Sequence, residues 1–512
     1  MIYGGALNNG FVLDDEDHIV NNAMVHEIGS FRDFFSGSTV NAAGSGRLGG
    51  IYYKPLMTLS YSALWTLFGS GPFSFHLYQL ILHILNSVLL FVFLRSFLQP
   101  SRPEGIFNAF AFFAAALFLI HPLNTEAVVY IACLQDILYL FFGMLALTYF
   151  AKSDQVSWKK SALTALILLC ALLSKETGLL FFIMIAVYAA LFRRAALWKV
   201  VFFEGAALAV YLWLRLGVAH LNIAHESITQ ISQASALTRL TTAPLALAMY
   251  LWQFVWPMHL TITQDWIVTS PLTLDSFYLP LITLVVSFGF SLWYWLRSRD
   301  QVFLFFFLWS IIGFGLHSQI LVPLDGVFAD RWFYFPGLGV IGMLATFCIR
   351  RWPDSRALRA IFLIVLVPMA IRSYVRSADW QDPFTLYSHD IEFLPGSYDL
   401  QNNLGVELFR RGRLSDAKTH FEISTQLAPH WTVNWNNLGS VHWSTGDLDR
   451  AEKDYLRSME NGTYHMAFEN YVSLLLKENR RPEAKAFLEN KALVLFPENP
   501  VLRQSLSKAN AP

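Results

Sequence analysis

The sequence predicts an all-α protein in two parts, a polytopic bundle of transmembrane helices followed by a C-terminal α-solenoid of short helix pairs. The first observation is composition: 55% of the 512 residues are hydrophobic and only 14% are charged, against roughly 25% charged in a soluble domain. The second is a series of apolar runs that approach the width of a bilayer. The third is a 34-residue repeat near the C-terminus.

Charge and cysteine content exclude several kinds of site. Lys and Arg together number 37, as do Asp and Glu, so no basic surface for nucleic acid is expected. Cys133, Cys170 and Cys348 lie far apart in or beside apolar runs, which gives neither a disulfide framework nor zinc-ligand spacing. We therefore expect buried thiols and no cofactor. A metal site on Asp and His side chains is an alternative, but outside the acidic loop no two such residues have ligand-like spacing, so no metal is expected.

Residues 1–74 are predicted to lie outside the membrane. Four acids are adjacent in the stretch Phe11–Asn21, namely Asp14, Asp15, Glu16 and Asp17. Neighbouring carboxylates repel each other and retain a proton more readily than a lone one, so one of them can act as acid or base near neutral pH. A solvated acidic turn is the alternative. The run Leu56–Phe68 is too short to cross and predicts a helix at the membrane interface.

Ten apolar runs predict a membrane domain over residues 75–376. A run of about 14 residues covers only about 21 Å as a helix, against about 30 Å of hydrocarbon, so some ends must dip below the membrane surface. The runs are 75–98, 106–121, 134–151, 160–174, 177–192, 199–216, 276–296, 302–320, 332–349 and 357–376.

Basic residues predict the orientation of these spans, because loops rich in Lys and Arg stay in the cytoplasm. Such residues gather in alternate loops: Arg95 and Arg102; Lys152, Lys159 and Lys160; Arg193, Arg194 and Lys199; Arg297 and Arg299; Arg350, Arg351, Arg356 and Arg359. The acidic loop and everything after Arg376 then lie on the periplasmic or luminal side. A single crossing by Leu245–Trp256 would reverse every later loop, so a re-entrant or interfacial hairpin is expected there.

Residues 377–512 are predicted to form about three tetratricopeptide repeats. Asn-Asn-Leu-Gly at 402–405 recurs at 436–439, Phe421 recurs as Tyr455, and a weaker third copy begins at Asn470. The small residues let paired helices pack closely, while the two aromatic residues fill the space between repeats. Such arrays present a concave surface that binds peptides or proteins.

Polar residues fall at the ends of the spans that should face the acidic loop. They are His76 and His83; His121, Glu126 and Asp136; Lys175 and Glu176; and Asp330 and Arg331. Ionisable groups in such places are costly and usually functional, and Lys54, Lys175 and Arg331 are cations suited to a phosphate. The alternatives are salt bridges between Lys175 and Glu176 or between Asp330 and Arg331, and core packing for the histidines.

Several of these stretches resemble the motifs of one family. FVLDDEDHIVNN at 11–22 is similar to its first outer loop, and YYKPLMTLSY at 52–61 is similar to a stretch with Arg in place of Lys54. Later matches are FHLYQLILHILN at 75–86, HPLNTEAVVYIACLQD at 121–136, SKETG at 174–178, PMHLTITQDW at 257–266, and ADRWFYFPGLG at 329–339, where Asp330 replaces Glu. Over most of its length the chain resembles the transmembrane and tetratricopeptide-repeat O-mannosyltransferases of the GT-C superfamily and their bacterial relatives.

The resemblance implies a GT-C-like bundle and an inverting glycosyltransferase. A sugar, mannose or a related hexose, would pass from a polyprenyl-phosphate carrier in the membrane to a Ser or Thr hydroxyl of a protein held by the repeats. Asp14 or Asp15 would be the general base, and Lys54, Lys175 and Arg331 would hold the donor phosphate. The resemblance also implies eleven spans, so we expect a further apolar segment of about 20 residues upstream of Met1.

Two other functions are consistent with the sequence. A non-enzymatic membrane scaffold would recruit partners through the repeats and use the spans only as an anchor. A transporter of lipid-linked sugars would carry polar residues spread through the middle of the bilayer, whereas the polar residues here gather at one face. Binding of a polyprenyl-phosphate sugar by the spans would distinguish the enzyme from the scaffold.

Overall fold

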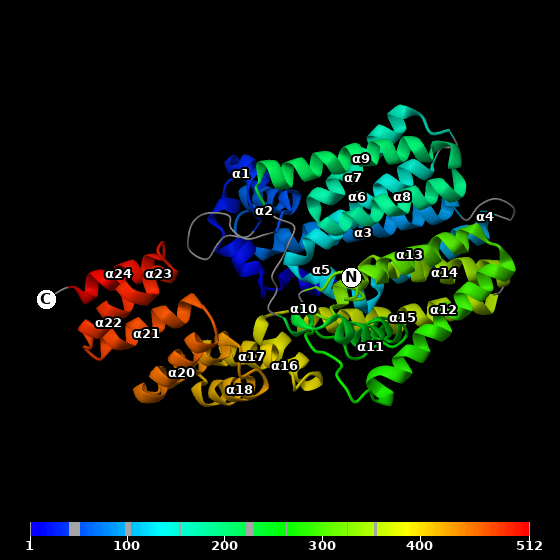
Figure 1. Cartoon of the computed structure of the whole chain (residues 1–512). Coiled ribbons are helices and arrows are strands. Elements are labelled where there is room, and N and C mark those ends of the chain that lie inside the picture. The colour runs from blue at the N-terminus through cyan, green and yellow to red at the C-terminus, as the bar shows by residue number, and fades with distance from the viewer. Residues whose placement is uncertain are drawn as a thin grey trace. The chain divides into compact units, whose positions relative to one another are not determined.

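The computed structural model describes residues 2–39, 52–97, 104–152, 155–221, 229–262, 264–324, 326–352 and 356–510. Over these ranges the fold is helical, and its only β-contact is an isolated bridge between Gln264 and Phe328. The chain divides into two compact units, Met1–Asp382 and Pro383–Pro512 (Figure 1). The predicted fold class, a bundle of membrane helices followed by a tetratricopeptide solenoid, is confirmed.

All ten predicted apolar runs form helices in the first unit. These helices are α3 (Pro72–Phe97), α4 (Glu104–Ile120), α6 (Leu134–Ala151), α7 (Trp158–Ser174), α8 (Leu179–Phe192), α9 (Leu197–Leu212), α12 (Leu279–Ser298), α13 (Gln301–His317), α14 (Pro336–Arg351) and α15 (Arg356–Asp379). Within the described ranges, five helical segments are long and apolar enough to cross a membrane, and a sixth arises if α4 and the bent segment Pro122–Val129 count as one span. The chain is therefore a multi-pass membrane protein.

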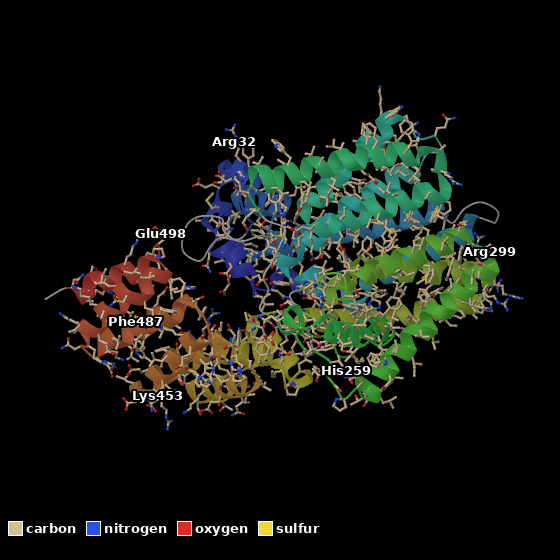
Figure 2. All side chains as sticks on the ribbon, in the orientation of Figure 1. Arg32, His259, Arg299, Lys453, Phe487 and Glu498 are labelled. Carbon is tan, nitrogen blue, oxygen red and sulfur yellow. The ribbon has the colours of Figure 1, made fainter. Side chains whose placement is uncertain are left out.

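The acidic loop packs at one end of this bundle. Figure 1 shows α1 (Phe31–Ser36) and α2 (Pro55–Phe68) at the end where α3 begins, and α6 packs against α3, α7 against α6 and α9 against α7. His76, near the start of α3, contacts the Asn9 carbonyl, whereas Arg95 lies about 29 Å further along the helix at 1.5 Å per residue. Figure 2 likewise shows Arg32 of α1 and Arg299, next to α12, at opposite ends of the unit. The acidic loop and these predicted cytoplasmic arginines thus lie at opposite ends.

Helix α11 (Ala236–Val255) corrects one prediction. It is a single helix of 20 residues with Pro244 in its interior, and the Ser235 side chain caps its first turn. The run Leu245–Trp256, predicted as a re-entrant or interfacial hairpin, does not turn back on itself but forms part of this one helix. The physical reason is visible in the sequence, because no Gly, Asn or Pro interrupts that run before Pro257 to turn the chain.

The second unit stacks helix pairs around its own apolar core. Its helices are α16 (Pro383–Phe393), α17 (Tyr398–Arg410), α18 (Leu414–Leu427), α19 (Thr432–Ser444), α20 (Leu448–Asn461), α21 (His465–Lys477), α22 (Arg481–Phe487), α23 (Leu493–Leu495) and α24 (Pro500–Ala509). A Cβ at Gly405 would lie 2.7 Å from the Phe421 ring, and one at Gly439 would lie 2.8 Å from the Tyr455 ring. The close packing of paired helices at small residues agrees with the prediction, and each ring packs against the glycine of its own helix pair. The domain boundary predicted after residue 376 falls inside α15, which continues to Asp379.

Candidate active site

Asp15 anchors the acidic loop to the segment before α6. Its Oδ2 accepts a hydrogen bond from the Val12 amide at 3.0 Å and its Oδ1 accepts one from the Ala132 amide at 2.7 Å. The side chain is 0% exposed. Burial raises the pKa of the Asp15 carboxyl well above its ordinary value, although the two amides lower it. Both oxygens are thus occupied by backbone groups, and neither faces solvent.

Asp14 is held differently from its neighbour. Its backbone N–H donates to the Tyr130 hydroxyl at 3.0 Å and its carbonyl accepts from the His18 amide at 2.8 Å. Its side chain is exposed, and no hydrogen bond or ion pair joins its carboxylate to another described residue. The main chain is therefore fixed while the carboxylate remains available. This distinguishes the two candidate bases, since only the carboxylate of Asp14 is exposed.

Lys54 is a buried cation at the start of α2. Its amide donates to the Thr39 hydroxyl at 2.8 Å, and its ammonium lies 4.3 Å from the centre of the Tyr52 ring. Burial lowers the pKa of Lys54 to about 8. Four nearby charges also act on it: Glu176, Lys175, Asp136 and Asp14. Across the described ranges, its ammonium forms no ion pair, although the side chain is only 8% exposed.

The other predicted cations are paired with carboxylates that lie far away in the sequence. Lys175 Nζ contacts Asp136 Oδ1 at 2.6 Å. The adjacent Glu176 is bound instead by Arg215, whose Nη1 lies 2.7 Å from its Oε1. The predicted alternative of a Lys175–Glu176 salt bridge is therefore wrong. Side chains of adjacent residues diverge at this helix start, so each reaches a different helix.

Arg331 is fixed by Glu126. The Arg331 guanidinium contacts one carboxylate oxygen of Glu126, and the Arg331 amide donates to the other at 2.9 Å. Burial opposes the charge of Arg331, but Glu126 and Asp136 outweigh it and raise the pKa of the guanidinium. Because Asp136 acts on both Arg331 and Lys54, the two cations belong to one charged cluster. Asp330 is buried in the same turn, at 1% exposure.

The three histidines join helices and lie outside this charged cluster. His83 contacts the Tyr334 hydroxyl at 2.7 Å and the Leu119 carbonyl at 2.9 Å. His76 contacts the Asn9 carbonyl at 3.2 Å, and His121 contacts the Phe254 carbonyl at 3.0 Å. These contacts match the core-packing alternative. In the described ranges, no three His, Cys, Asp or Glu side chains are grouped so as to hold a metal ion.

The sequence did not predict a role for two residues of this region, Arg215 and Tyr130. Arg215 binds Glu176, and its only signal was a lone cation at the end of the apolar run 199–216. Tyr130 holds the backbone of Asp14, and nothing in its local pattern distinguishes it from an interfacial tyrosine. Both belong to contacts between segments far apart in the chain, which periodicity does not report.

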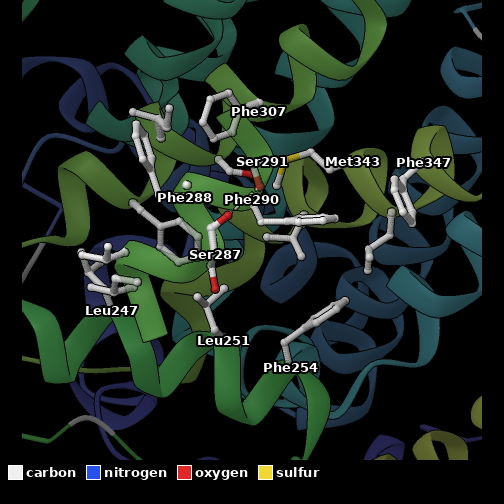
Figure 3. Close-up of a pocket in the computed structure, with 18 of the residues that line it drawn as sticks. Leu247, Leu251, Phe254, Ser287, Phe288, Phe290, Ser291, Phe307, Met343 and Phe347 are labelled. Atoms are coloured by element: carbon white, nitrogen blue, oxygen red, sulfur yellow. Dashed lines mark hydrogen bonds between the residues drawn. The ribbon is translucent and has the colours of Figure 1, made fainter. Parts of the chain in front are cut away.

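An apolar cavity lies between α11, α12, α13 and α14. Its volume is about 870 Å³. Figure 3 shows Leu251 and Phe254 of α11 on one side of the space, with Phe307 and Met343 on the other. Its lining extends from Phe303 of α13 to Ser318, the residue that follows this helix, which is about 22 Å at 1.5 Å per residue.

The cavity wall also contacts the turn that carries Arg331. The ring centres of Phe254 and Phe333 are 5.6 Å apart, and those of Phe314 and Phe333 are 6.0 Å apart. Phe333 lies in the same short helix as Arg331. The cavity therefore begins behind the turn that contributes Arg331 to the charged cluster.

Relatives with known names match most of this chain, although no family model matches it. The protein O-mannosyl-transferase F38B6.6 of Caenorhabditis elegans is 24% identical over 443 residues, covering 84% of this chain and 61% of the relative. The human protein O-mannosyl-transferase TMTC3 is 23% identical over 501 residues, covering 89% of this chain and 53% of the relative. The chain spans about half the length of the curated relatives it matches.

Among solved structures, ArnT from Cupriavidus metallidurans in the apo state is similar, with 15% identity, coverage of 98% of this chain and 93% of that chain, and a TM-score of 0.42. That score is too low to base an assignment on. The sequence matches confirm the predicted resemblance: the chain is similar to the protein O-mannosyl-transferases along most of its length.

Proposed function

We propose that this protein is a membrane glycosyltransferase that moves a sugar, mannose or a related hexose, from a polyprenyl-phosphate donor to a Ser or Thr hydroxyl. Two features of the charged cluster carry the proposal. The carboxylate of Asp14 is exposed, and the nearby lysine Lys54 is buried and forms no ion pair among the described residues. A carboxylate base and a buried anion-binding cation at the same end of a membrane bundle suit this reaction. The names of the relatives support the same reaction class.

The reaction follows from these positions. The acceptor oxygen forms a bond to the anomeric carbon while the bond from that carbon to the phosphate oxygen breaks. The phosphate leaves with the bonding electrons, and the hydroxyl proton passes to Asp14. Because attack and departure occur on opposite faces, the configuration at the anomeric carbon inverts. Asp15 holds the loop in place and takes no proton from the acceptor.

Lys54 is the primary ligand that we assign to the donor phosphate. A buried ammonium without a carboxylate gains most from an incoming anion, since its desolvation has already occurred. Lys175 and Arg331 already contact Asp136 and Glu126. They would act through their remaining N–H groups and stabilise the charge that develops on the phosphate.

The apolar cavity between α11 and α14 is the place that we assign to the isoprenoid tail. It runs about 22 Å along α13 and begins behind the turn that bears Arg331. A chain lying there would keep its hydrocarbon in an apolar space while its phosphate reaches the charged cluster. We assign the repeats to the protein acceptor, on the side of the membrane that faces the acidic loop.

Sugar transfer by single variants in the acidic loop tests the proposal. Purified full-length protein would be assayed with polyprenyl-phosphate mannose and a Ser/Thr-containing acceptor peptide. Asp14→Asn should lower the rate about 100-fold or more, the usual contribution of a general base. Asp17→Asn, an exposed acid of the same loop, should retain the wild-type rate. Wild-type activity in Asp14→Asn would overturn the assignment of the base.

A membrane scaffold remains the second candidate, because the repeats alone would suit it. The two functions differ in donor binding. An enzyme of the proposed kind binds polyprenyl-phosphate mannose, and Lys54→Ala weakens that binding. A scaffold binds no donor, so the absence of saturable binding to the wild-type protein would favour it.

A further inference from the structure

A polar pocket lies at the end of the membrane unit opposite the acidic loop, the end predicted to face the cytoplasm. Its volume is about 480 Å³, and it is formed where α12 turns into α13, against the last turn of α14. The guanidinium groups of Arg299 and Arg350 and the carboxylate of Asp300 line it, and Figure 2 shows Arg299 at this end of the unit. We call it the arginine pocket. Its cations outnumber its one anion, so it is suited to an anionic ligand.

The carboxylate of Asp300 is already occupied by groups of the protein. Its Oδ1 accepts hydrogen bonds from the Val302 and Phe303 amides at 2.9 and 3.3 Å, which caps the first turn of α13. Its Oδ2 accepts from Arg350 Nε at 2.8 Å. No further hydrogen bond joins the Nη groups of Arg350 to the described part of the chain, and this side chain is 42% exposed. Asp300 thus orients Arg350 and leaves its terminal N–H groups available.

Arg299 adds a second cation to the pocket at a backbone position that disfavours it. Its φ of 53° lies in the left-handed region, where glycine is the usual residue at the end of a helix. Its guanidinium lies 5.7 Å from the centre of the Trp295 ring, and within the described ranges it forms no ion pair. Glycine would end α12 with less strain. The turn therefore carries a charged side chain that its conformation does not require.

Apolar surface adjoins the arginine pocket. Tyr294 lines the pocket, and its ring centre lies 4.6 Å from that of Phe303 and 5.0 Å from that of Phe347. Both phenylalanines line the apolar cavity between α11 and α14. Trp293 and Trp352, at the same end, are 56% and 45% exposed, and exposed tryptophans are typical of the headgroup level of a bilayer. A charged group in the pocket would thus lie directly beside hydrocarbon.

We propose that the arginine pocket binds the phosphate of an anionic phospholipid, whose acyl chains lie against the apolar surface beside Tyr294. Guanidinium N–H groups form strong, charge-assisted hydrogen bonds to phosphate oxygens, and basic pockets between spans suit such headgroups. A phosphatidylcholine headgroup is less suitable, because its own ammonium would lie near Arg299 and Arg350. The pocket and the acidic loop are at opposite ends of the unit, so this inference does not depend on the proposed function.

The alternative is a diffuse attraction between the arginines of this end and any anionic membrane surface. Such an attraction depends on the number of charges and not on their place. Arg351 separates the two explanations. It is adjacent to Arg350 but does not line the pocket, and its guanidinium lies 5.7 Å from the centre of the Trp352 ring. A specific site requires Arg350 and not Arg351, whereas a diffuse attraction requires both equally.

Native mass spectrometry of the full-length protein in detergent tests the proposal, with phosphatidylglycerol and phosphatidylcholine of identical acyl chains as the two probes. The first phosphatidylglycerol should bind about tenfold more tightly than phosphatidylcholine. Arg299→Gln and Arg350→Gln should each weaken its binding about tenfold, the effect of one hydrogen bond between charged groups. Arg351→Gln is the matched control and should retain the wild-type affinity. Arg299→Gln is the cleaner variant, because Arg299 has no ion pair to lose among the described residues.

Equal binding of the two lipids, or an equal loss of affinity in Arg351→Gln, would overturn the proposal. Glycerol 3-phosphate supplies the same phosphate without acyl chains. If it displaces phosphatidylglycerol at similar concentrations, the pocket takes a soluble anion and the assignment to a lipid is wrong. Arg350→Lys, which keeps a cation beside Asp300, should bind phosphatidylglycerol better than Arg350→Gln does. Arg299→Gln and the wild type should unfold at the same temperature in lipid-free detergent, which guards against an effect of folding.

Discussion

The two units differ in how far apart in the sequence their polar partners lie. In the repeats, Asn470 and Asn436 are separated by one period of 34 residues. In the membrane unit, Arg331 and Glu126 are separated by 205 residues, and Asp15 and Ala132 by 117. Contacts between repeats can be inferred from the sequence, because neighbouring copies carry the same residue types at equivalent positions. For a site assembled from distant loops, the sequence indicates only the residue types, because the fold as a whole decides which residues become partners.

The ion pairs of the two units also differ in burial. Glu126 is 2% exposed where it contacts Arg331. In the repeats, Arg480 and Glu452 are 33% and 23% exposed. A buried charge is stabilised mainly by its partner, so loss of that partner is costly. An exposed charge is instead solvated by water when its partner is lost. The same substitution should therefore have very different effects in the two units.

Loss of Glu126 should have the largest effect. Glu126→Ala removes the carboxylate that binds Arg331 and should lower the free energy of unfolding of the membrane unit by about 3 kcal/mol or more. Glu452→Ala should lower that of the repeats by less than about 1 kcal/mol. Urea unfolding in detergent, followed by tryptophan fluorescence, measures both. Equal losses would show that the burial of the two pairs does not control their contribution.

A methyl group in the repeat interface should have an intermediate effect. At Gly439 the new Cβ would lie 2.8 Å from the Tyr455 ring, so Gly439→Ala should destabilise the repeats by about 1–3 kcal/mol through overpacking. Gly396→Ala, where the added carbon meets nothing within 4 Å, is the matched control. Thermal unfolding followed by circular dichroism compares the two. If Gly439→Ala is as stable as its control, the close approach of the paired helices is not required.

The pH dependence of donor binding should be the smallest of the three effects. The pKa of Lys54 is lowered by burial to about 8, so its ammonium is charged below that pH and loses its proton above it. Affinity for a polyprenyl-phosphate should be constant below about pH 8 and should fall by up to tenfold for each further pH unit. Lys54→Arg should remove this dependence, because arginine stays charged. A flat profile in the wild type would contradict the assignment of Lys54 to the phosphate.

Much of the architecture could be predicted from the sequence. The ten apolar helices follow from hydropathy, and the repeats follow from the 34-residue period. The pattern also predicted that Asp14, Lys54, Asp136, Lys175 and Arg331 would gather at one end of the bundle, and the charges acting on Lys54 and Arg331 agree with this. Hydropathy does not report whether an apolar run turns back on itself, however, so the run that forms part of α11 was interpreted as a hairpin.

The individual partners in the site could not be predicted. Lys175 and Glu176 are adjacent, yet they bind Asp136 and Arg215, each 39 residues away. Similarly, the pair Asp14 and Asp15 was indistinguishable in sequence, and only the hydrogen bonds of Asp15 to Val12 and Ala132 separate their roles. Helix crossing and loop docking decide such contacts, and neither leaves a local signature.

One wall of the apolar cavity has a consequence for how a long-chain ligand would arrive. Helix α12 borders the cavity, yet Pro280 is its only buried residue, and Ile282, Val286 and Trp293, which do not line the cavity, are more than half exposed. In a bilayer that outward surface touches lipid rather than water. A hydrocarbon chain could thus slide in sideways past α12 from within the membrane, without its apolar length ever passing through the aqueous phase.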